Sequence, residues 1–158
     1  MNKLIVFSFL FTFFLASRVI SVEAEVGKWT FTKEENYCFV LSLPLKEEGN
    51  YDPSNRGDTY VMVYRMNQRP EIIVMINAGY NYNIDKDIVM KIDGSNFELF
   101  SEGDDTAWSV NEDKKIILAM KKGRDMIIKG TSSRGTLTTD TYTLTGFTAT
   151  YNRFDKDC

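Results

Sequence analysis

The sequence predicts a mainly β protein, folded as an antiparallel β-sandwich or a partly open barrel, with two short helices. About eight short segments are rich in β-branched and aromatic residues, and turn residues separate them at intervals of roughly 8 to 12 positions. No alternation of strands and helices runs along the chain, which argues against a parallel sheet.

The strands are predicted from composition, alternation and the turns between them. Residues 59–66 (TYVMVYRM) are the clearest strand, and a short link leads to a second strand at 71–77, so we expect a hairpin. Asp93-Gly94 predicts another hairpin, between strands at 87–92 and 96–100. The other predicted strands cover residues 29–32, 37–42, 124–130 and 136–145, and the predicted loops and turns cover 44–58, 78–85 and 101–106.

Helical spacing appears in two places. Residues 113–122 (DKKIILAMKK) fit either a strand or a helix, and the apolar stripe with a basic last turn before Gly123 favours a helix. Phe147, Tyr151 and Phe154 lie at i, i+4 and i+7, which places the three rings on one face of a final helix. We expect this C-terminal helix to cap the sheet.

Residues 1–24 predict export. Lys3 gives a positive start, residues 4–15 form an uncharged and mostly apolar run, and small side chains stand at Val22 and Ala24. A membrane-spanning helix needs about 20 apolar residues, so a secretory signal peptide is favoured over the alternative, an uncleaved anchor. We therefore expect a signal peptide at 1–24, one domain at 25–158, a periplasmic or secreted location, and no membrane span after cleavage.

The composition excludes several classes of function. Without Lys3, Arg18 and Glu23 the chain keeps 17 of its 19 basic and 21 of its 22 acidic residues, a net charge of −4. This balance argues against binding to nucleic acid or to anionic lipid. The sequence has no histidine, so Ser-His-Asp triads and His-ligated metal sites are excluded. We expect no metal and no cofactor.

Cys38 and Cys158 are the only cysteines. In an oxidising compartment such a pair is most simply a disulfide, which here ties the end of the chain to an early strand. The alternative is a redox-active pair, which is disfavoured because the two cysteines are far apart in sequence and do not form a Cys-x-x-Cys motif.

Four residues are candidates for binding. Tyr80, Tyr82 and Trp108 flank polar turns and can form an aromatic patch, although Trp108 can instead pack in the core beside Ala107. Arg134 lies in a predicted turn, where it can contact an anion or a partner. The alternative for Arg134 is a structural ion pair with Asp140.

Three further motifs carry weaker predictions. Residues 56–58 spell Arg-Gly-Asp, the tripeptide of integrin ligands, which also arises by chance in loops. Residues 81–87 alternate Asn and Asp, but Lys86 and Ile92 stand where a calcium-binding EF-hand requires Gly and Glu. Asp104 and Asp105 are the leading candidates for acid–base chemistry, yet carboxylates in turns are usually solvated.

The C-terminal third resembles a known family. The run Gly130-Thr131-Ser132-Ser133-Arg134-Gly135-Thr136 is followed by Thr139-Asp140-Thr141-Tyr142, Leu144, Gly146-Phe147 and Ala149. This pattern is similar to the signature of the invasion-associated locus B family, which comprises secreted proteins of alphaproteobacteria. Weaker matches extend the resemblance from Trp29 to Cys158, and Thr150 departs from the more usual alanine.

The resemblance implies an exported, mainly β protein that needs no cofactor, and it carries over no catalytic residue. Our leading hypothesis is therefore a non-enzymatic protein that binds an unknown protein or a component of the cell envelope. One alternative is a hydrolase of cell-wall material that uses Asp104 or Asp105. The other is a structural protein that stabilises the envelope.

Overall fold

The computed structural model describes residues 24–158, so the predicted signal peptide, apart from Ala24, lies outside the described residues. The strands in chain order are β1 (Thr30–Lys33), β2 (Tyr37–Ser42), β3 (Lys46–Gly49), β4 (Tyr60–Met66), β5 (Ile72–Asn77), β6 (Ile88–Ile92), β7 (Ser95–Phe100), β8 (Thr106–Ser109), β9 (Asp125–Thr131) and β10 (Leu137–Thr143). The helices are α1 (Asp113–Lys122), α2 (Phe147–Tyr151), α3 (Phe154–Asp157) and the short 3-10 helix η1 (Pro53–Asn55).

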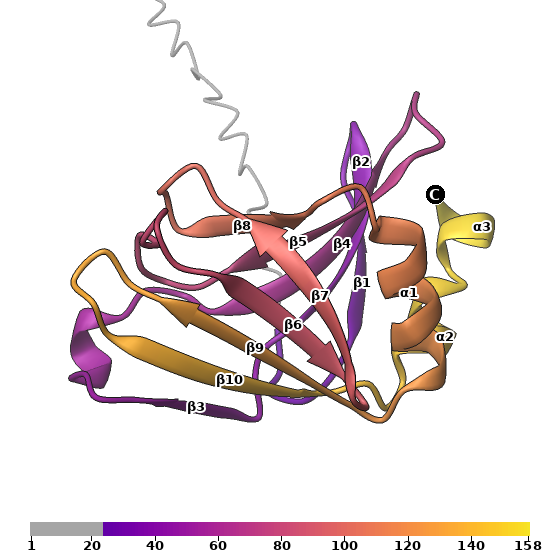
Figure 1. Ribbon diagram of the computed structural model, residues 1–158. Coiled ribbons are helices and arrows are strands. Elements are labelled where there is room, and N and C mark those ends of the chain that lie inside the picture. Colours follow the sequence, from indigo (N-terminus) through magenta and orange to yellow (C-terminus); the bar gives the residue numbers. More distant parts are fainter. Residues whose placement is uncertain (1–23) are drawn as a thin grey trace, which may run out of the picture.

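The described strands form one antiparallel sheet of ten strands that curls into a half-barrel (Figure 1). Their order is β1-β2-β4-β5-β8-β7-β6-β9-β10-β3. Strands β2 and β3 lie near opposite ends of this order, yet only residues 43–45 link them. The four Cα–Cα steps from Ser42 to Lys46 span at most about 14 Å, so the curl must bring the two edges of the sheet close together. The predicted mainly β, partly open barrel is confirmed.

Two strands escaped prediction because neighbours in the sheet, rather than their own composition, create them. Strand β3 (KEEG) is exposed at all four positions and lies inside the predicted loop 44–58. It forms because it pairs with the edge of β10, from Lys46 opposite Thr141 to Gly49 opposite Thr138. Strand β8 begins at Thr106, the last residue of the turn predicted at 101–106, and lies between β5 and β7.

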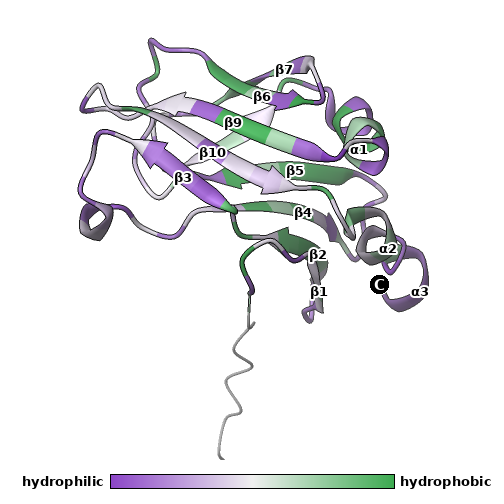
Figure 2. Cartoon of the chain, turned by 90° about the horizontal axis from the view of Figure 1, so that it is seen from below, coloured by the Kyte–Doolittle hydropathy of each residue, from purple (hydrophilic) through white to green (hydrophobic). Residues whose placement is uncertain are grey.

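The core lies on the concave face of the sheet and under the helices. Alternate residues point inward in most of the strands, as in Val61 and Val63 of β4 and in Met126 and Ile128 of β9, which are all buried. Figure 2 shows hydrophobic stretches on β2, β4, β5 and β9, whereas β3 is hydrophilic. The alternation used for prediction therefore reports which side chains face the core.

Helix α1 has the predicted bounds and places Ile116, Ile117 and Met120 in the core. The Asp113 carboxylate in its first turn accepts a hydrogen bond of 2.7 Å from the backbone N–H of Val74, which fixes the helix against β5. The helix ends at Gly123, where a Cβ atom would lie 2.7 Å from Ile92 and 3.0 Å from Leu144. Close packing requires a glycine at this position.

The predicted C-terminal helix is in fact two short helices, α2 and α3. A tight turn separates them, in which the N–H of Arg153 donates to the carbonyl of Thr150. The three rings still share one side: Phe147 and Phe154 are fully buried, and Tyr151 packs between them with centroid distances of 5.6 and 5.3 Å. Among the described residues no helix is long and apolar enough to cross a membrane.

The predicted Cys38–Cys158 disulfide is present, with the two Cα atoms 5.9 Å apart and 120 residues between them in sequence. Two side chains add to this attachment of the C-terminus. Arg65 donates to the backbone carbonyl of Phe154 at 2.6 Å, and Lys33 donates to that of Asp157 at 2.9 Å. The chain end is thereby held against β1, β2 and β4.

We expect Cys158→Ser to lower the free energy of unfolding by about 2 to 5 kcal/mol, because the disulfide closes a long loop of the unfolded chain. Urea unfolding followed by circular dichroism measures the change. The wild-type protein under reducing conditions should match the variant, and reductant should leave the variant unchanged. Equal stability of variant and oxidised wild type would contradict the expectation.

Candidate functional site

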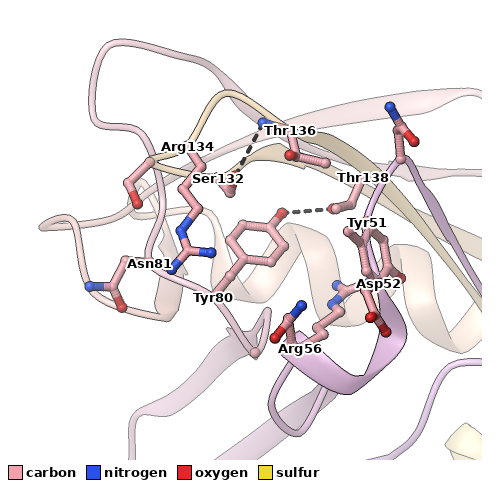
Figure 3. Close-up of a pocket in the computed structure, with 13 residues that line it drawn as sticks. Tyr51, Asp52, Arg56, Tyr80, Asn81, Ser132, Arg134, Thr136 and Thr138 are labelled. Carbon is pink, nitrogen blue, oxygen red and sulfur yellow. Dashed lines mark hydrogen bonds between the residues drawn. The ribbon is translucent and has the colours of Figure 1, made fainter.

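The structure contains a pocket of about 510 Å³ (Figure 3), and Figure 1 shows η1 and the turn between β9 and β10 at the side of the molecule away from α1, α2 and α3. Three segments line the pocket, and they are far apart in sequence. One is the loop around η1, the second follows β5, and the third is the turn between β9 and β10 with the start of β10. The residues involved fall within 50–56, 79–81 and 132–138.

A buried ion pair supports the floor of this pocket. The Arg56 guanidinium donates two hydrogen bonds to the Asp140 carboxylate, at 2.8 and 2.7 Å, and both side chains are 4% exposed. Arg56 also donates to the carbonyl of Ala78 at 2.9 Å and to the Tyr51 hydroxyl at 2.8 Å, and it lies 3.1 Å from the Glu47 carboxylate. These partners meet the requirement that a buried charge be paired and hydrogen-bonded.

The pair stays charged. Burial alone would lower the pKa of Arg56, but the hydrogen bonds and charge of Asp140 outweigh this effect and raise the pKa. Burial raises the pKa of Asp140, and the hydrogen bonds and charge of Arg56 oppose this rise without cancelling it, so the short bidentate contact is what identifies the ion pair. Because the guanidinium is buried and committed to Asp140 and its other partners within the protein, Arg56 acts as a structural element of the pocket.

Tyr80 is the central aromatic residue of the site and is held from three sides. Its hydroxyl is hydrogen-bonded to the Thr138 hydroxyl at 2.7 Å, and its ring meets Tyr82 edge-on with centroids 5.3 Å apart. The Arg56 guanidinium lies 5.2 Å from the ring centroids of both Tyr80 and Tyr51. Gly130 leaves the necessary room, since a Cβ there would lie 2.6 Å from the Tyr82 ring.

Tyr82 is buried, although the sequence predicted that it flanks a polar turn as part of an aromatic binding patch. It is 2% exposed, because it points into the barrel beneath Tyr80 while its backbone bridges to Ser132. Burial raises the pKa of Tyr82 well above that of a free tyrosine. Tyr82 therefore supports Tyr80 and offers no binding surface of its own.

Trp108 is neither in the core nor in the pocket. Along β8 the side chains alternate, and Ala107 takes the buried side, so Trp108 lies half-buried on the opposite face of the sheet. There it packs on Phe100, with ring centroids 5.9 Å apart, and Phe100 is itself 46% exposed. Of the four predicted binding residues, the fold brings together Tyr80 and Arg134, with Tyr82 beneath them.

Arg134 is exposed on the turn between β9 and β10, and Figure 3 shows its guanidinium over the pocket beside Tyr80 and Asn81. The alternative role proposed from sequence, an ion pair with Asp140, is wrong because Arg56 occupies that carboxylate. Within residues 24–158 Arg134 forms no salt bridge. The turn itself is fixed, since the N–H of Ser133 donates to the carbonyl of Asn81 at 2.7 Å.

The Arg-Gly-Asp tripeptide is not displayed for adhesion, because the Arg56 side chain is buried and committed to Asp140. Asp104 and Asp105 form turn contacts: the Asp104 carboxylate accepts from the Thr106 hydroxyl at 2.9 Å, and Asp105 accepts from Asn77 at 3.1 Å. These bonds give both carboxylates a structural role.

The calcium-like segment is a turn, in which the side chain of Asn83 accepts from the N–H of Asp85 at 3.0 Å. In the described part of the chain no three His, Cys, Asp or Glu residues gather as metal ligands.

Sequence reasoning missed the residues that build the pocket, namely Tyr51, Asp52, Arg56 and Asp140 in these roles. Arg56 and Asp140 are 84 positions apart, and no local pattern couples them. The concentration of Tyr, Asn and Asp in residues 50–55 is the one sequence signal that marks a polar binding loop. The Asp52 carboxylate accepts from the hydroxyl and N–H of Ser54, which lowers the pKa of Asp52 and keeps it ionised.

Comparisons with known proteins agree on one family. A family model described as invasion associated locus B (IalB) protein matches residues 29–155. The crystal structure of invasion associated protein B from Bartonella henselae aligns with a TM-score of 0.55 at 16% sequence identity, over 82% of this chain and 92% of that chain. At this identity the likeness concerns the fold alone. No curated protein matches the sequence.

We expect Arg56→Gln to lower the free energy of unfolding by about 3 to 5 kcal/mol, because Asp140 would remain as an unpaired buried charge. Arg134→Gln, on the exposed turn, should change it by less than about 0.5 kcal/mol. Denaturant unfolding measures both variants.

A control separates the ion pair from simple loss of packing. The double variant Arg56→Gln with Asp140→Asn removes both charges, so it should lose less stability than the sum of the two single variants. Additive losses would show that the pair does not stabilise the site in the way described.

Proposed function

Because the chain belongs to the invasion associated locus B family, we propose that it is an exported protein that binds a component of the envelope or an extracellular partner, and that it does so without catalysing a reaction. In this proposal residues 1–24 are removed and residues 25–158 form the working domain. The Cys38–Cys158 disulfide supports export, since structural disulfides persist in oxidising compartments.

The observation that carries the binding proposal is the state of Arg134. It is the cation over the pocket whose ion-pair partner is not already supplied by the described residues, whereas Arg56 is paired with Asp140. The pocket floor beneath it is held by Thr138, Tyr82 and the buried ion pair. A ligand would therefore meet a site that is already ordered, which lowers the entropy lost on binding.

Two features support a binding role over a catalytic one. The sequence lacks histidine, the usual general base at neutral pH. Asp104 and Asp105, the residues that the hydrolase hypothesis requires, are engaged in turn hydrogen bonds, and neither lines the pocket. Among residues 24–158 the pocket lining contains one carboxylate, Asp52, rather than the pair that glycoside hydrolysis uses.

Export is tested by mass spectrometry of the protein purified from its native host. We expect the mass of a chain that begins at Glu25 and contains one disulfide. A chain that retains the first 24 residues with both thiols free would refute the location and the maturation scheme together.

Binding at the pocket is tested by photo-cross-linking in living cells. A benzoylphenylalanine at Asn81, an exposed residue of the pocket wall, should capture a specific partner, and Arg134→Gln should weaken that capture. The same probe at Lys91, exposed on β6 and remote from the pocket, serves as the control. Identical adducts at both positions, or none at Asn81, would refute the pocket as the binding site.

A further inference from the structure

We infer that the pocket binds an acidic saccharide, a sugar unit that carries a single carboxylate, and that Arg134 pairs with this carboxylate. This inference rests on the proposed function and names the chemical class of its ligand. Four properties of the pocket support this inference: its rigid tyrosines, its asparagine amides that form no hydrogen bond within the described residues, its distribution of charge, and neighbouring strands whose edges are already paired. The volume of about 510 Å³ lies within the range of small-molecule sites.

The tyrosines supply flat apolar surface. Tyr80 and Tyr51 both line the pocket, and Figure 3 shows the Tyr80 ring between Arg134 and Tyr51. Both rings are fixed through Arg56, and Tyr80 is also fixed through its hydroxyl. A rigid tyrosine contributes large contact area at low entropic cost, which suits the C–H face of a sugar ring.

The polar side chains around these rings match hydroxyl groups. Asn50, Asn55 and Asn81 line the pocket, and their amides form no hydrogen bond with another side chain or backbone group of residues 24–158. An amide both donates and accepts, as a sugar hydroxyl does, so each can satisfy a hydroxyl on a ligand. The exposed Ser133 hydroxyl adds a further group of this kind.

Within the described part of the chain, the pocket has one cation available to a ligand and one carboxylate, which favours a ligand with a single negative charge. Arg56 is neutralised by Asp140 and Glu47, which leaves Arg134 as the cation available to a ligand. Asp52 stands across the pocket from Arg134 (Figure 3) and is ionised. A ligand with several phosphates or sulfates would be repelled by Asp52, whereas one carboxylate fits the planar guanidinium of Arg134 and sugar hydroxyls can donate to Asp52.

The backbone around the pocket disfavours a peptide ligand. Strand addition needs a free sheet edge, but β9 is paired with β6 and β10, and β10 is paired with β9 and β3. The outer edge of β3 is open, yet Lys46, Glu47 and Glu48 line that strand, and charged edges oppose strand pairing. Recognition at this pocket must therefore use side chains.

The test is calorimetric titration of the exported protein with three probes: trigalacturonic acid methyl-esterified at two of its three carboxylates, its fully esterified and uncharged form, and the capped peptide acetyl-Ala-Glu-Ala-amide, which also carries one carboxylate. We expect the acid to bind about tenfold more tightly than its uncharged ester, the effect of one charge-assisted contact. Arg134→Gln should weaken binding of the acid about tenfold and leave the ester unchanged. Arg124→Gln, which alters an exposed arginine outside the pocket, is the matched control and should leave both unchanged.

The outcomes separate this inference from the proposed function. Equal affinity for acid and ester, or no effect of Arg134→Gln, overturns the role of the carboxylate. Binding of the peptide alone overturns the saccharide class. If neither trisaccharide binds while the cross-link at Asn81 persists, the ligand class is wrong and the binding site stands. If the cross-link is also absent, the proposed function fails with it.

Discussion

The buried pair of Arg56 and Asp140 is the constraint on which the open end of this half-barrel depends. Asp140 sits on β10 and Arg56 follows η1, so the pair joins the loop after β3 to the strand that β3 borders. A buried guanidinium needs hydrogen-bond acceptors to offset the loss of water. Besides Asp140, the Tyr51 hydroxyl and the carbonyl of Ala78 accept from Arg56. The Arg56 side chain thus links the loop around η1 to β10 and to the segment that follows β5.

Different interactions hold the two ends of the half-barrel together, the end beside the C-terminal helices and the end with the pocket. At one end the Cys38–Cys158 disulfide and the rings of α2 and α3 hold the chain terminus against the first strands. At the other end an ion pair, with the Tyr51 and Tyr80 rings packed against its guanidinium, orders a polar opening. The closure by the disulfide and the rings is built from buried groups, whereas the closure by the ion pair orders the polar side chains that surround the pocket.

The division of roles between the two arginines explains how such a site can bind. Arg56 is buried and paired with Asp140, and the Tyr51 and Tyr80 rings pack against its guanidinium. Arg134 projects from a turn that backbone hydrogen bonds hold in place, so its guanidinium is presented without a large loss of backbone freedom on binding. The family to which the chain belongs and its fold are compatible with this role, and the proposed ligand class follows from the side chains of this particular pocket.

The sequence alone determined the features that depend on local periodicity. Alternation located most strands, the apolar stripe located α1 with its bounds, and the spacing of Phe147, Tyr151 and Phe154 placed three rings together. Tertiary structure alone decided that KEEG would become an edge strand, that Tyr82 would point inward and Trp108 outward, and that Arg56 would meet Asp140. The reason is physical: periodicity records which residues share a face, while the curl and register of the sheet decide where that face points and which distant residues it meets.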